Sequence, residues 1–407
     1  MLLVSLALRN IMRNKRRSFL TISAMVLSSA MLLLAIGVSA GKMHDMLASA
    51  TDQYYGHIVI SGNGYQKSRS IFTNFQLEPE QLKILAGLDF VKGYSPRLRG
   101  FGLLCRKDNS LPVEALGIRP EMEKNVTVLQ DSLVAGKQLG NDPDGVLLGE
   151  GLARKLGVSP GDDLAFVSGA SDGSVGNGIL VVKGIFRTGN FRNDNELILL
   201  NLDWLQETLV LPDTVHSLAV SVQNPMQAKL IAAKLQNLFG NRFEVLDWSS
   251  FLPEIRDAIA ISYVTNIIVM TIFYLATGLG IFNTFYMSVM ERSYEFGILM
   301  ALGTRPWQIR LLVLLETFFM GVIAVTLGVG LGLGINIYLQ NAGIDLSGSV
   351  EPITYAGGTI LPRIHASIDF FYQISAALFL LFVCIAAGFL PANRAAKLNP
   401  VQVIRGD

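Results

Sequence analysis

The chain has 407 residues, of which 51% are hydrophobic and only 16% are charged. Its 33 Lys and Arg residues nearly balance its 32 Asp and Glu residues, which leaves a net charge of +1. The distribution excludes an ordinary soluble protein, because four apolar runs contain no charged residue: 18–41, 258–290, 317–344 and 370–393. Each reaches the ~20 residues that a helix needs to cross a bilayer. Since every backbone N–H must be paired inside lipid, these runs predict the helices of an integral membrane protein.

Residues 1–17 are strongly basic and contain no acid. The bases alternate with apolar and small polar side chains, as in a helix that lies along the inner membrane surface. The bases are Arg9, Arg13, Lys15, Arg16 and Arg17, and the residues between them include Leu3, Leu6, Ala7, Asn10 and Met12. We predict a cytoplasmic interfacial helix over 1–17. The alternative is a basic tail that only sets the topology.

The run 18–41 predicts the first transmembrane helix. Val38-Ser39-Ala40 also resembles the cleavage site of a secretory signal peptide. However, the run is longer than the roughly 7–15 apolar residues of a signal peptide, and the basic segment precedes it. A retained membrane helix is the favoured interpretation.

Residues 42–257 form a large polar block in which strand and helix patterns alternate. The sequence HIVIS at 57–61 predicts a strand, 79–88 has helical periodicity, and 91–98 is extended. Near the other end, 218–222 predicts a strand, Pro225 opens a helix through 239, and 243–248 predicts another strand. We predict an α+β, ferredoxin-like porter module built from 42–99 and 216–257.

A β-rich module is predicted between these segments, at 100–215. Glycines separate its short predicted strands, at 113–118, 164–167, 179–186 and 197–200. Such insertions are tolerated because the ends of a domain commonly lie close together. Gly161-Asp162-Asp163 could suggest paired catalytic carboxylates, but a polar β-turn is the favoured interpretation. Acids slightly outnumber bases in the whole block, so we expect no nucleic-acid partner.

The second transmembrane helix, predicted over 258–290, is longer than a bilayer requires. It would extend roughly 50 Å at 1.5 Å per residue, against a hydrocarbon core of ~30 Å. We expect it to protrude outward as a rigid stalk that carries motion across the membrane without a channel.

The loop 291–310 predicts a short amphipathic helix. It is too short and too charged to span, and four of its residues recur at helical spacing: Tyr294, Ile298, Ala301 and Leu302. Gly303 is placed to end this helix, and Pro306 can begin the next one. Such a helix suits docking into a groove on a soluble partner. The alternative is a plain connector along the membrane interface.

The third transmembrane helix is predicted over 311–340 and the fourth over 370–391. Four glycines of the third form overlapping G-x-x-x-G pairs that let another helix approach, or they only loosen the helix. They are Gly328, Gly330, Gly332 and Gly334. Glu316, in the same helix, is a functional candidate, or it reaches the interface or pairs with Arg310. No span carries a row of charges, which argues against a small-ion pathway.

Basic residues near the span ends predict the orientation. The loop 291–310 and the tail 392–407 carry Arg292, Arg305, Arg310, Arg394, Lys397 and Arg405. The loop 341–369 instead has one base and three acids: Arg363, Asp345, Glu351 and Asp369. The positive-inside rule then places both termini and 291–310 in the cytoplasm, and 42–257 and 341–369 on the far side.

Motifs for catalysis or cofactor binding are absent from the sequence. It has no G-x-x-x-x-G-K-[ST], no strand-to-helix G-x-G-x-x-G, no G-x-S-x-G and no H-E-x-x-H. Cys105 lies in the polar block and Cys384 in the fourth span, so we expect neither a disulfide between them nor a metal site. We predict a chain that is not an enzyme and binds no cofactor itself.

Three segments resemble one family. ERSYEFGILMALG, beginning at Glu291, is similar to the coupling segment of the ABC transporter permeases grouped with macrolide exporters, lipoprotein-releasing permeases and FtsX-like proteins. LRNIMRNKRRSFLT at 8–21 and PANRAAKLNPVQVIRGD at 391–407 resemble the ends of that family. VLLGEGLARKLGVSPGDDL at 146–164 and VVKGIFRTGNFRNDNELILL at 181–200 look most like the outer domains of lipoprotein-releasing (LolC/LolE-type) permeases.

The resemblance implies a type VII, mechanotransmitting permease of the bacterial inner membrane. The implied partners are an ABC ATPase dimer that binds the ATP, a second permease copy or paralogue, lipoprotein cargo, a periplasmic carrier and membrane lipid. The residues that carry over as ATPase contacts are Glu291, Arg292, Glu295, Gly297 and Gly303.

The implied function is the extraction and release of lipoproteins, or similar amphipathic cargo, from the outer leaflet of the inner membrane. Between two such permeases, the outer ends of the first two spans would form an apolar, laterally open cleft, since charge-poor spans suit acyl chains. Its predicted lining is Met31, Leu34, Val38, Ile261, Val264 and Ile268. The alternatives are an FtsX-like regulator of cell-wall hydrolases, for which this outer domain is large, and an efflux permease for macrolides or peptides.

Overall fold

The computed structural model describes residues 2–13, 15–140, 142–346, 353–355, 358–360 and 363–398. The chain divides into two compact units. We call Met1–His44, Ile261–Leu346 and Arg363–Asp407 the membrane unit, and Asp45–Ala260 and Ser347–Pro362 the outer unit. Glu351 and Arg405, used for the predicted orientation, lie outside the described residues, as does 399–407 of the predicted tail.

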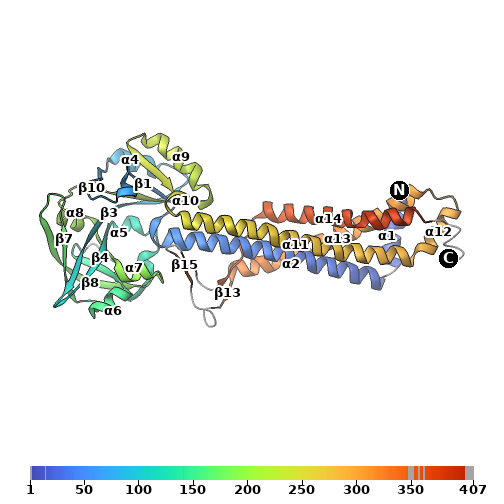
Figure 1. Cartoon of the computed structure of the whole chain (residues 1–407), viewed down its shortest axis with the longest axis horizontal. Helices are drawn as coiled ribbons and strands as arrows, with labels where there is room; N and C mark the ends of the chain where they lie inside the picture. Colours follow the sequence, from blue (N-terminus) through green and yellow to red (C-terminus); the bar gives the residue numbers. More distant parts are fainter. Residues whose placement is uncertain are drawn as a thin grey trace. The chain divides into compact units, whose positions relative to one another are not determined.

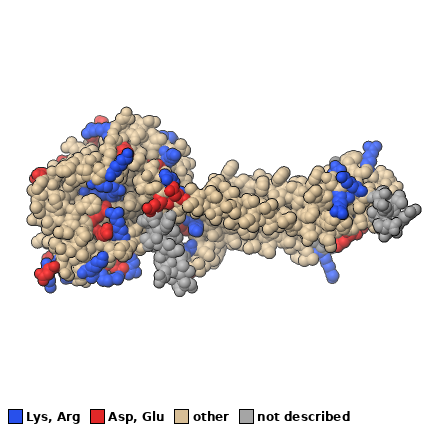
Figure 2. All heavy atoms as spheres, in the orientation of Figure 1, with Lys and Arg blue, Asp and Glu red and all other residues tan. Residues whose placement is uncertain are grey.

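Four of the described helices are long and apolar enough to cross a membrane, which confirms the predicted number of spans. They are α2 Lys15–Ala50, α11 Pro253–Glu291, α13 Pro306–Asn341 and α14 Phe370–Ala396, and Figure 1 shows them running side by side. Each helix extends beyond its predicted span, because polar residues continue the helix outside the apolar stretch. The 39 residues of α11 correspond to roughly 58 Å. Figure 2 shows few charged side chains along the middle of the membrane unit and a group of Lys and Arg near its end.

Two short helices and a strand pair complete the described part of the membrane unit. They are α1 Leu2–Arg13, α12 Ser293–Ala301, and β13 Ile344–Asp345 paired antiparallel with β16 Arg363–Ile364. Within the predicted loop 341–369, Arg363 and Asp345 form an ion pair at 3.5 Å.

Glycines allow α13 to approach α2 closely. A Cβ on Gly328 would lie 2.4 Å from the nearest side-chain atom of α2, and a Cβ on Gly332 would lie 2.9 Å away. A Cβ on Gly330 or Gly334 would meet no atom of the described part of the chain within 4 Å. Residues four apart share a helix face and residues two apart do not. The close packing within this chain therefore rests on Gly328 and Gly332, and the predicted packing role does not extend to Gly330 and Gly334.

The outer unit is a mixed α/β structure. Its helices and helical turns are η1 Thr51–Tyr55, α3 Tyr65–Ser68, α4 Pro79–Ala86, α5 Pro120–Glu123, η2 Leu129–Asp131, α6 Glu150–Leu156, α7 Phe191–Glu196, α8 Leu202–Thr208, η3 Pro225–Gln227, α9 Ala228–Phe239 and α10 Trp248–Phe251. Its strands are β1 Ile58–Gly62, β2 Phe75–Gln76, β3 Val91–Arg106, β4 Asn109–Ile118, β5 Leu133–Gly136, β6 Gly145–Gly149, β7 Asp163–Gly169, β8 Val175–Phe186, β9 Leu197–Asn201, β10 Thr214–Val215, β11 Ser217–Val222, β12 Phe243–Asp247, β14 Ile353–Tyr355 and β15 Gly358–Ile360. Each strand and helix predicted within 42–257 corresponds to one of these elements, whereas β5 and β6 were not predicted.

One end of the main sheet has the order β12-β1-β11-β3, with all neighbours antiparallel. The chain passes through α4 between β1 and β3, and through α9 between β11 and β12. Leu85 of α4 and Leu235 of α9 are fully buried in the core that contains residues of these strands. Figure 1 shows α4 and α9 in the same part of the outer unit as β1 and β10.

At the other end of the main sheet, β3 and five further strands close on themselves. The pairings β3–β4, β4–β9, β9–β6, β6–β8, β8–β7 and β7–β3 form a ring of six strands. Closure leaves few exposed edges, which protects a strand-rich structure from edge-to-edge association. β5 adds to the outer side of this ring by pairing with β8.

The predicted boundary at residue 100 falls inside β3, so the two parts of the outer unit are not separate modules. The first half of β3 pairs with β11 and its second half with β4 and β7. One hydrophobic core runs through both parts, from Met46 to Ile255. β3 has 16 residues and finds strand partners in both parts of the outer unit, so the two parts are fused along it.

The polar turn favoured at Gly161-Asp162-Asp163 is present. Gly161 has φ +99, and Asp162 accepts from the Ser159 N–H at 2.8 Å, just before β7 begins at Asp163.

Candidate functional site: a polar junction between α1, α12 and α13

α1 packs against α13 through a narrow apolar face. Ala7 is fully buried, in one cluster with Ile309 and Leu312 of α13. Arg9 and Arg13 are exposed. The N-terminal helix predicted over 1–17 is therefore present as α1, but it ends at Arg13, and Lys15 already belongs to α2. The contact of α1 with a membrane surface stays a prediction.

The loop between α11 and α13 is built as its sequence predicts. The N–H of Gly303 donates to Met300 O, and the N–H of Thr304 donates to Leu299 O, each at 3.0 Å. With φ +97 at Gly303, these two bonds form the Schellman motif that ends α12. Pro306 is the first residue of α13, and the Arg305 N–H donates to Gln308 Oε1 at 2.8 Å.

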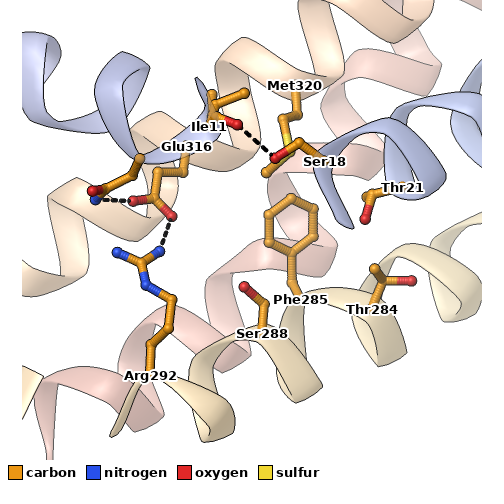
Figure 3. A pocket seen from close by; sticks show the side chains of 10 residues that line it. Ile11, Ser18, Thr21, Thr284, Phe285, Ser288, Arg292, Glu316 and Met320 are labelled. Atoms are coloured by element: carbon orange, nitrogen blue, oxygen red, sulfur yellow. Dashed lines mark hydrogen bonds and ion pairs between the residues drawn. The ribbon is translucent and has the colours of Figure 1, made fainter. Parts of the chain in front are cut away.

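A buried carboxylate connects this loop to α1 and α13. Glu316 Oε2 accepts from Arg292 Nη1 at 2.8 Å, and Glu316 Oε1 accepts from Asn10 Nδ2 at 2.7 Å (Figure 3). The side chains of Arg292 and Glu316 are only 12% and 6% exposed. The Arg292 guanidinium also lies 5.1 Å from the ring centroid of buried Phe296. The carboxylate of Glu316 thus joins α1, the 291–310 loop and α13.

A second ion pair lies at the surface of the same junction. Glu295 Oε1 accepts from Arg13 Nη2 at 2.6 Å, and Glu295 Oε2 accepts from Arg292 Nε at 3.2 Å. Arg13 and Glu295 are about half exposed, so this contact contributes little stability on its own. We call the five residues Asn10, Arg13, Arg292, Glu295 and Glu316 the polar junction.

A small pocket opens beside the polar junction (Figure 3). Together with its open mouth it encloses about 370 Å³. Its lining combines the buried ion pair with hydroxyl groups from α2 and α11: Asn10, Ile11, Ser18, Thr21, Thr284, Phe285, Ser288, Arg292, Glu316 and Met320. These groups provide a polar environment for Glu316 at the level of the membrane helices, which explains how a charge is tolerated there.

The residues predicted to contact an ATPase fall into two groups. Arg292 turns inward to Glu316, and Gly297 is buried within α12. Glu291 and Gly303 are exposed, and Glu295 is half exposed. Among the alternatives considered for Glu316, the pairing with Arg310 is wrong, because the carboxylate pairs with Arg292. The sequence analysis did not predict the roles of Asn10 and Arg13. The signal for Asn10 was an amide among the apolar residues of α1, together with Glu316 as the single acid near the start of an apolar span.

An apolar face of the loop has no partner among the described residues. Ile298 is 38% exposed and Leu302 is 78% exposed, and Tyr294 lies on the same side of α12. Trp307, at the start of α13, is also more than half exposed. The opposite face, with Phe296, is buried. We call Tyr294, Ile298 and Leu302 the exposed ridge of α12. These apolar side chains are accessible to a groove on another protein.

The six predicted cleft residues lie on the outward faces of α2 and α11. Met31, Ile261, Val264 and Ile268 are each at least half exposed, and Leu34 and Val38 are partly buried. Other residues make the contacts of α2 and α11 inside the chain, among them Leu32 and Ile281.

Comparison with known proteins covers both units. Residues 18–238 match the family model described as MacB-like periplasmic core domain, and residues 267–400 match FtsX-like permease C-terminal. The macrolide export ATP-binding/permease protein MacB of Psychrobacter arcticus is 22% identical over 411 residues, which cover 97% of this chain and 58% of that protein. The chain therefore spans little more than half the length of this relative.

Two further similarities concern a smaller part of the chain. The lipoprotein-releasing system transmembrane protein LolC of Neisseria meningitidis serogroup B is 24% identical over 330 residues, which cover 76% of this chain and 77% of that protein. The crystal structure of the periplasmic region of MacB from Actinobacillus actinomycetemcomitans has a TM-score of 0.37 and 15% sequence identity, and the match covers 51% of this chain and 95% of that one.

Proposed function

Because this chain belongs to the family of ABC transporter permeases with a MacB-like periplasmic core domain and an FtsX-like C-terminal domain, we propose that it extracts and releases lipoproteins or similar amphipathic cargo by mechanical transmission. In this proposal the ATP-driven step occurs in a separate ABC ATPase dimer, and the permease works with a second copy or a paralogue. The chain itself is not catalytic.

The observation that carries this proposal is the direct continuation of membrane helices into the outer unit. Only Gly56 and His57 separate the helical end of α2 and η1 from β1, and only Leu252 separates α10 from α11. Connections of one or two residues are shorter than a separate linker segment. The order β12-β1-β11-β3, with α4 and α9, supports a ferredoxin-like porter module as the receiver of that movement.

The orientation is part of the proposal. Arg9, Arg13 and the bases of the 291–310 loop favour a bacterial inner membrane with both termini in the cytoplasm and the outer unit in the periplasm. The ATPase would then meet the exposed ridge of Tyr294, Ile298 and Leu302, with Glu291, Glu295 and Gly303 at its edge. The polar junction holds this ridge at a fixed position on α13, so a push on α12 would move α13 as well.

Lipoprotein cargo is supported by the outward apolar side chains of α2 and α11. Facing a second permease, they would enclose acyl chains, each buried CH₂ contributing ~0.8 kcal/mol. A periplasmic carrier would receive the released lipoprotein. Macrolide or peptide efflux is the second candidate, favoured by the similarity to a MacB over nearly the whole chain. Regulation of a cell-wall hydrolase, as in the FtsX-like branch, is the third.

Depletion of the chain in its host distinguishes these functions. Lipoproteins held back in the inner membrane would support the proposal, together with lipoprotein bound to the purified complex. Drug or peptide sensitivity with normal lipoprotein sorting would favour efflux, and defective cell separation with normal sorting would favour hydrolase control. The purified chain alone should not hydrolyse ATP, and sustained hydrolysis by it would contradict a separate ATPase.

A further inference from the structure

The end of α2 is a turn of π-helix that leads directly into the outer sheet. η1 continues α2 without a break, since Ala50 keeps helical angles of φ −81 and ψ −40. The N–H of Gly56, at φ +76, donates to Thr51 O at 2.7 Å, five residues back. Such a bond across five residues is a usual way for a helix to end, but here the π-helical conformation extends over all five residues of η1. As at any helix end, the last carbonyls need partners from elsewhere.

Arg97 of β3 supplies one of these partners. Its Nη1 donates to Tyr54 O at 2.6 Å. Its other donors form a bidentate pair, or fork, with the carboxylate of Glu123. Nη2 donates to Oε1 at 2.5 Å, and Nε donates to Oε2 at 3.2 Å. Glu123 also accepts from the Thr127 hydroxyl at 2.6 Å. The Arg97 and Glu123 side chains are only 2% and 1% exposed. The two parallel hydrogen bonds of the fork fix the orientation of the guanidinium group.

The side chain of Tyr54 is held as firmly as its carbonyl. Its hydroxyl donates to Glu114 Oε1 at 2.8 Å, and Arg99 Nη1 lies 3.4 Å from the same oxygen. The guanidinium groups of Arg97 and Arg99 lie 5.8 and 5.3 Å from the centroid of the Tyr54 ring. One residue of the π-turn is therefore attached to β3 and β4 by its backbone, its ring and its hydroxyl.

Stability alone does not account for this arrangement. Burying an ion pair carries a desolvation penalty that often equals or exceeds its attraction, and well-packed apolar residues commonly replace such pairs without loss. Apolar residues could not, however, donate a hydrogen bond to the open carbonyl of the π-turn. Arg97 can do so while Glu123 fixes its orientation.

We propose that Arg97, oriented by Glu123, is a positioning residue that locks the π-turn of η1 onto β3, so that a movement of α2 reaches the outer sheet instead of being lost by unwinding of the turn. This inference rests on the proposed function, in which the movement originates at the membrane helices. The lock itself is a property of the outer unit and can be measured separately.

The test uses the full-length chain with its ATPase and partner permease, and compares Arg97→Lys with Arg106→Lys. Arg106 lies on the same strand and pairs with Asp162 at 2.8 Å, away from the π-turn. A lysine at position 97 keeps the charge but lacks the planar fork of donors with which Arg97 bonds Glu123 and Tyr54 O together. Hydrogen exchange at the Gly56 amide should become about tenfold faster or more in Arg97→Lys, as expected when one hydrogen bond to a charged group is lost, and stay unchanged in Arg106→Lys.

The second readout is the amount of cargo released per ATP hydrolysed. It should fall several-fold in Arg97→Lys while ATP hydrolysis stays close to wild type. The thermal unfolding temperature should fall by only a few degrees, as the loss of one hydrogen bond implies. Should Arg97→Lys fail to fold, Glu123→Gln, which keeps Arg97 but weakens the fork, should shift both readouts in the same direction. Unchanged Gly56 exchange would overturn the lock, and faster exchange with unchanged release per ATP would overturn its role in transmission. A wild-type complex that releases no cargo would instead count against the proposed function.

Discussion

Arg292 and Glu316 face each other at 2.8 Å, one at the start of the loop helix α12 and the other in the third turn of α13. Asn10 adds α1 to the same carboxylate. The pair converts a surface loop into an extension of the membrane helix. In the proposed function, a partner that pushes on α12 would act on α13 through this ion pair as well as through the connection 302–305.

Replacing Arg292 alone should destabilise the membrane unit strongly. Arg292→Leu leaves the nearly buried Glu316 without its cation, at a cost of about 3 kcal/mol or more. The double variant Arg292→Leu/Glu316→Leu should recover most of this stability, because no unpaired charge remains. Thermal unfolding in detergent measures both effects. Arg310→Leu is the control, since Arg310 Nε has no hydrogen-bond partner among the residues that the structure describes. An equal loss in this control would contradict a specific role for Arg292.

The exposed ridge of α12 should be needed for binding the ATPase and not for folding. Leu302 is 78% exposed, so Leu302→Asp should leave the unfolding temperature unchanged while co-purification of the ATPase is lost. Leu302→Met, which keeps an apolar side chain of similar volume, should retain the complex. Normal ATPase recovery with Leu302→Asp would show that the ridge is not the docking surface.

Substitutions in the third span should depend on which face each glycine occupies. Gly328→Ala would place a Cβ 2.4 Å from α2, and forcing the helices apart should cost roughly 1–3 kcal/mol. Gly330→Ala meets nothing within 4 Å and should leave the stability of the isolated chain unchanged. The yield and thermal stability of the two purified variants give the comparison. Similar losses in both would mean that α2 and α13 do not pack as described.

Cargo binding should depend on the outward face of α11. Ile268 is 56% exposed, so Ile268→Asp introduces a charge into the proposed acyl-chain cleft without disturbing the packing inside the chain. Bound lipoprotein should be lost from the purified complex while the ATPase remains attached. Ile268→Leu serves as the control and should retain cargo. If the Ile268→Asp complex carries as much bound lipoprotein as wild type, the cargo does not bind at this face of α11.

Acid should weaken the outer unit through Glu123. Burial raises the pKa of Glu123, but the Arg97 charge and the hydrogen bonds from Arg97 and Thr127 lower it, and the net pKa lies below its ordinary value of 4.5. A carboxyl with a lower pKa in the folded state contributes stability above its unfolded pKa, and this contribution is lost as the pH falls through the folded pKa. The unfolding temperature should therefore decline below about pH 5 more steeply in wild type than in Glu123→Gln. Fluorescence of Trp204 and Trp248 can follow the transition, and parallel pH profiles would contradict this assignment.

Much of the local structure follows from the sequence because its causes are local. Uncharged runs long enough for a bilayer determined the four helices, since backbone groups in lipid must pair within a helix. Gly303 and Pro306 determined the ends of α12 and α13, because a left-handed residue and a residue without an N–H act at their own positions. Alternating β-branched residues likewise determined β1, β11 and β12.

The tertiary structure alone decided which distant groups meet. The sequence identifies Glu316 as a single acid in an apolar stretch. It offers two arginines as partners, Arg292 just before α12 and Arg310 in the first turns of α13, and only the packing of α1, α12 and α13 selects Arg292. Gly328 and Gly330 belong to equivalent sequence patterns, yet only the former faces α2. The closed ring of strands, and the position of Arg97 beneath the π-turn, depend on pairings between strands far apart in the chain. Local periodicity encodes which face of an element is apolar, whereas the partner of that face is determined by the contacts of the whole fold.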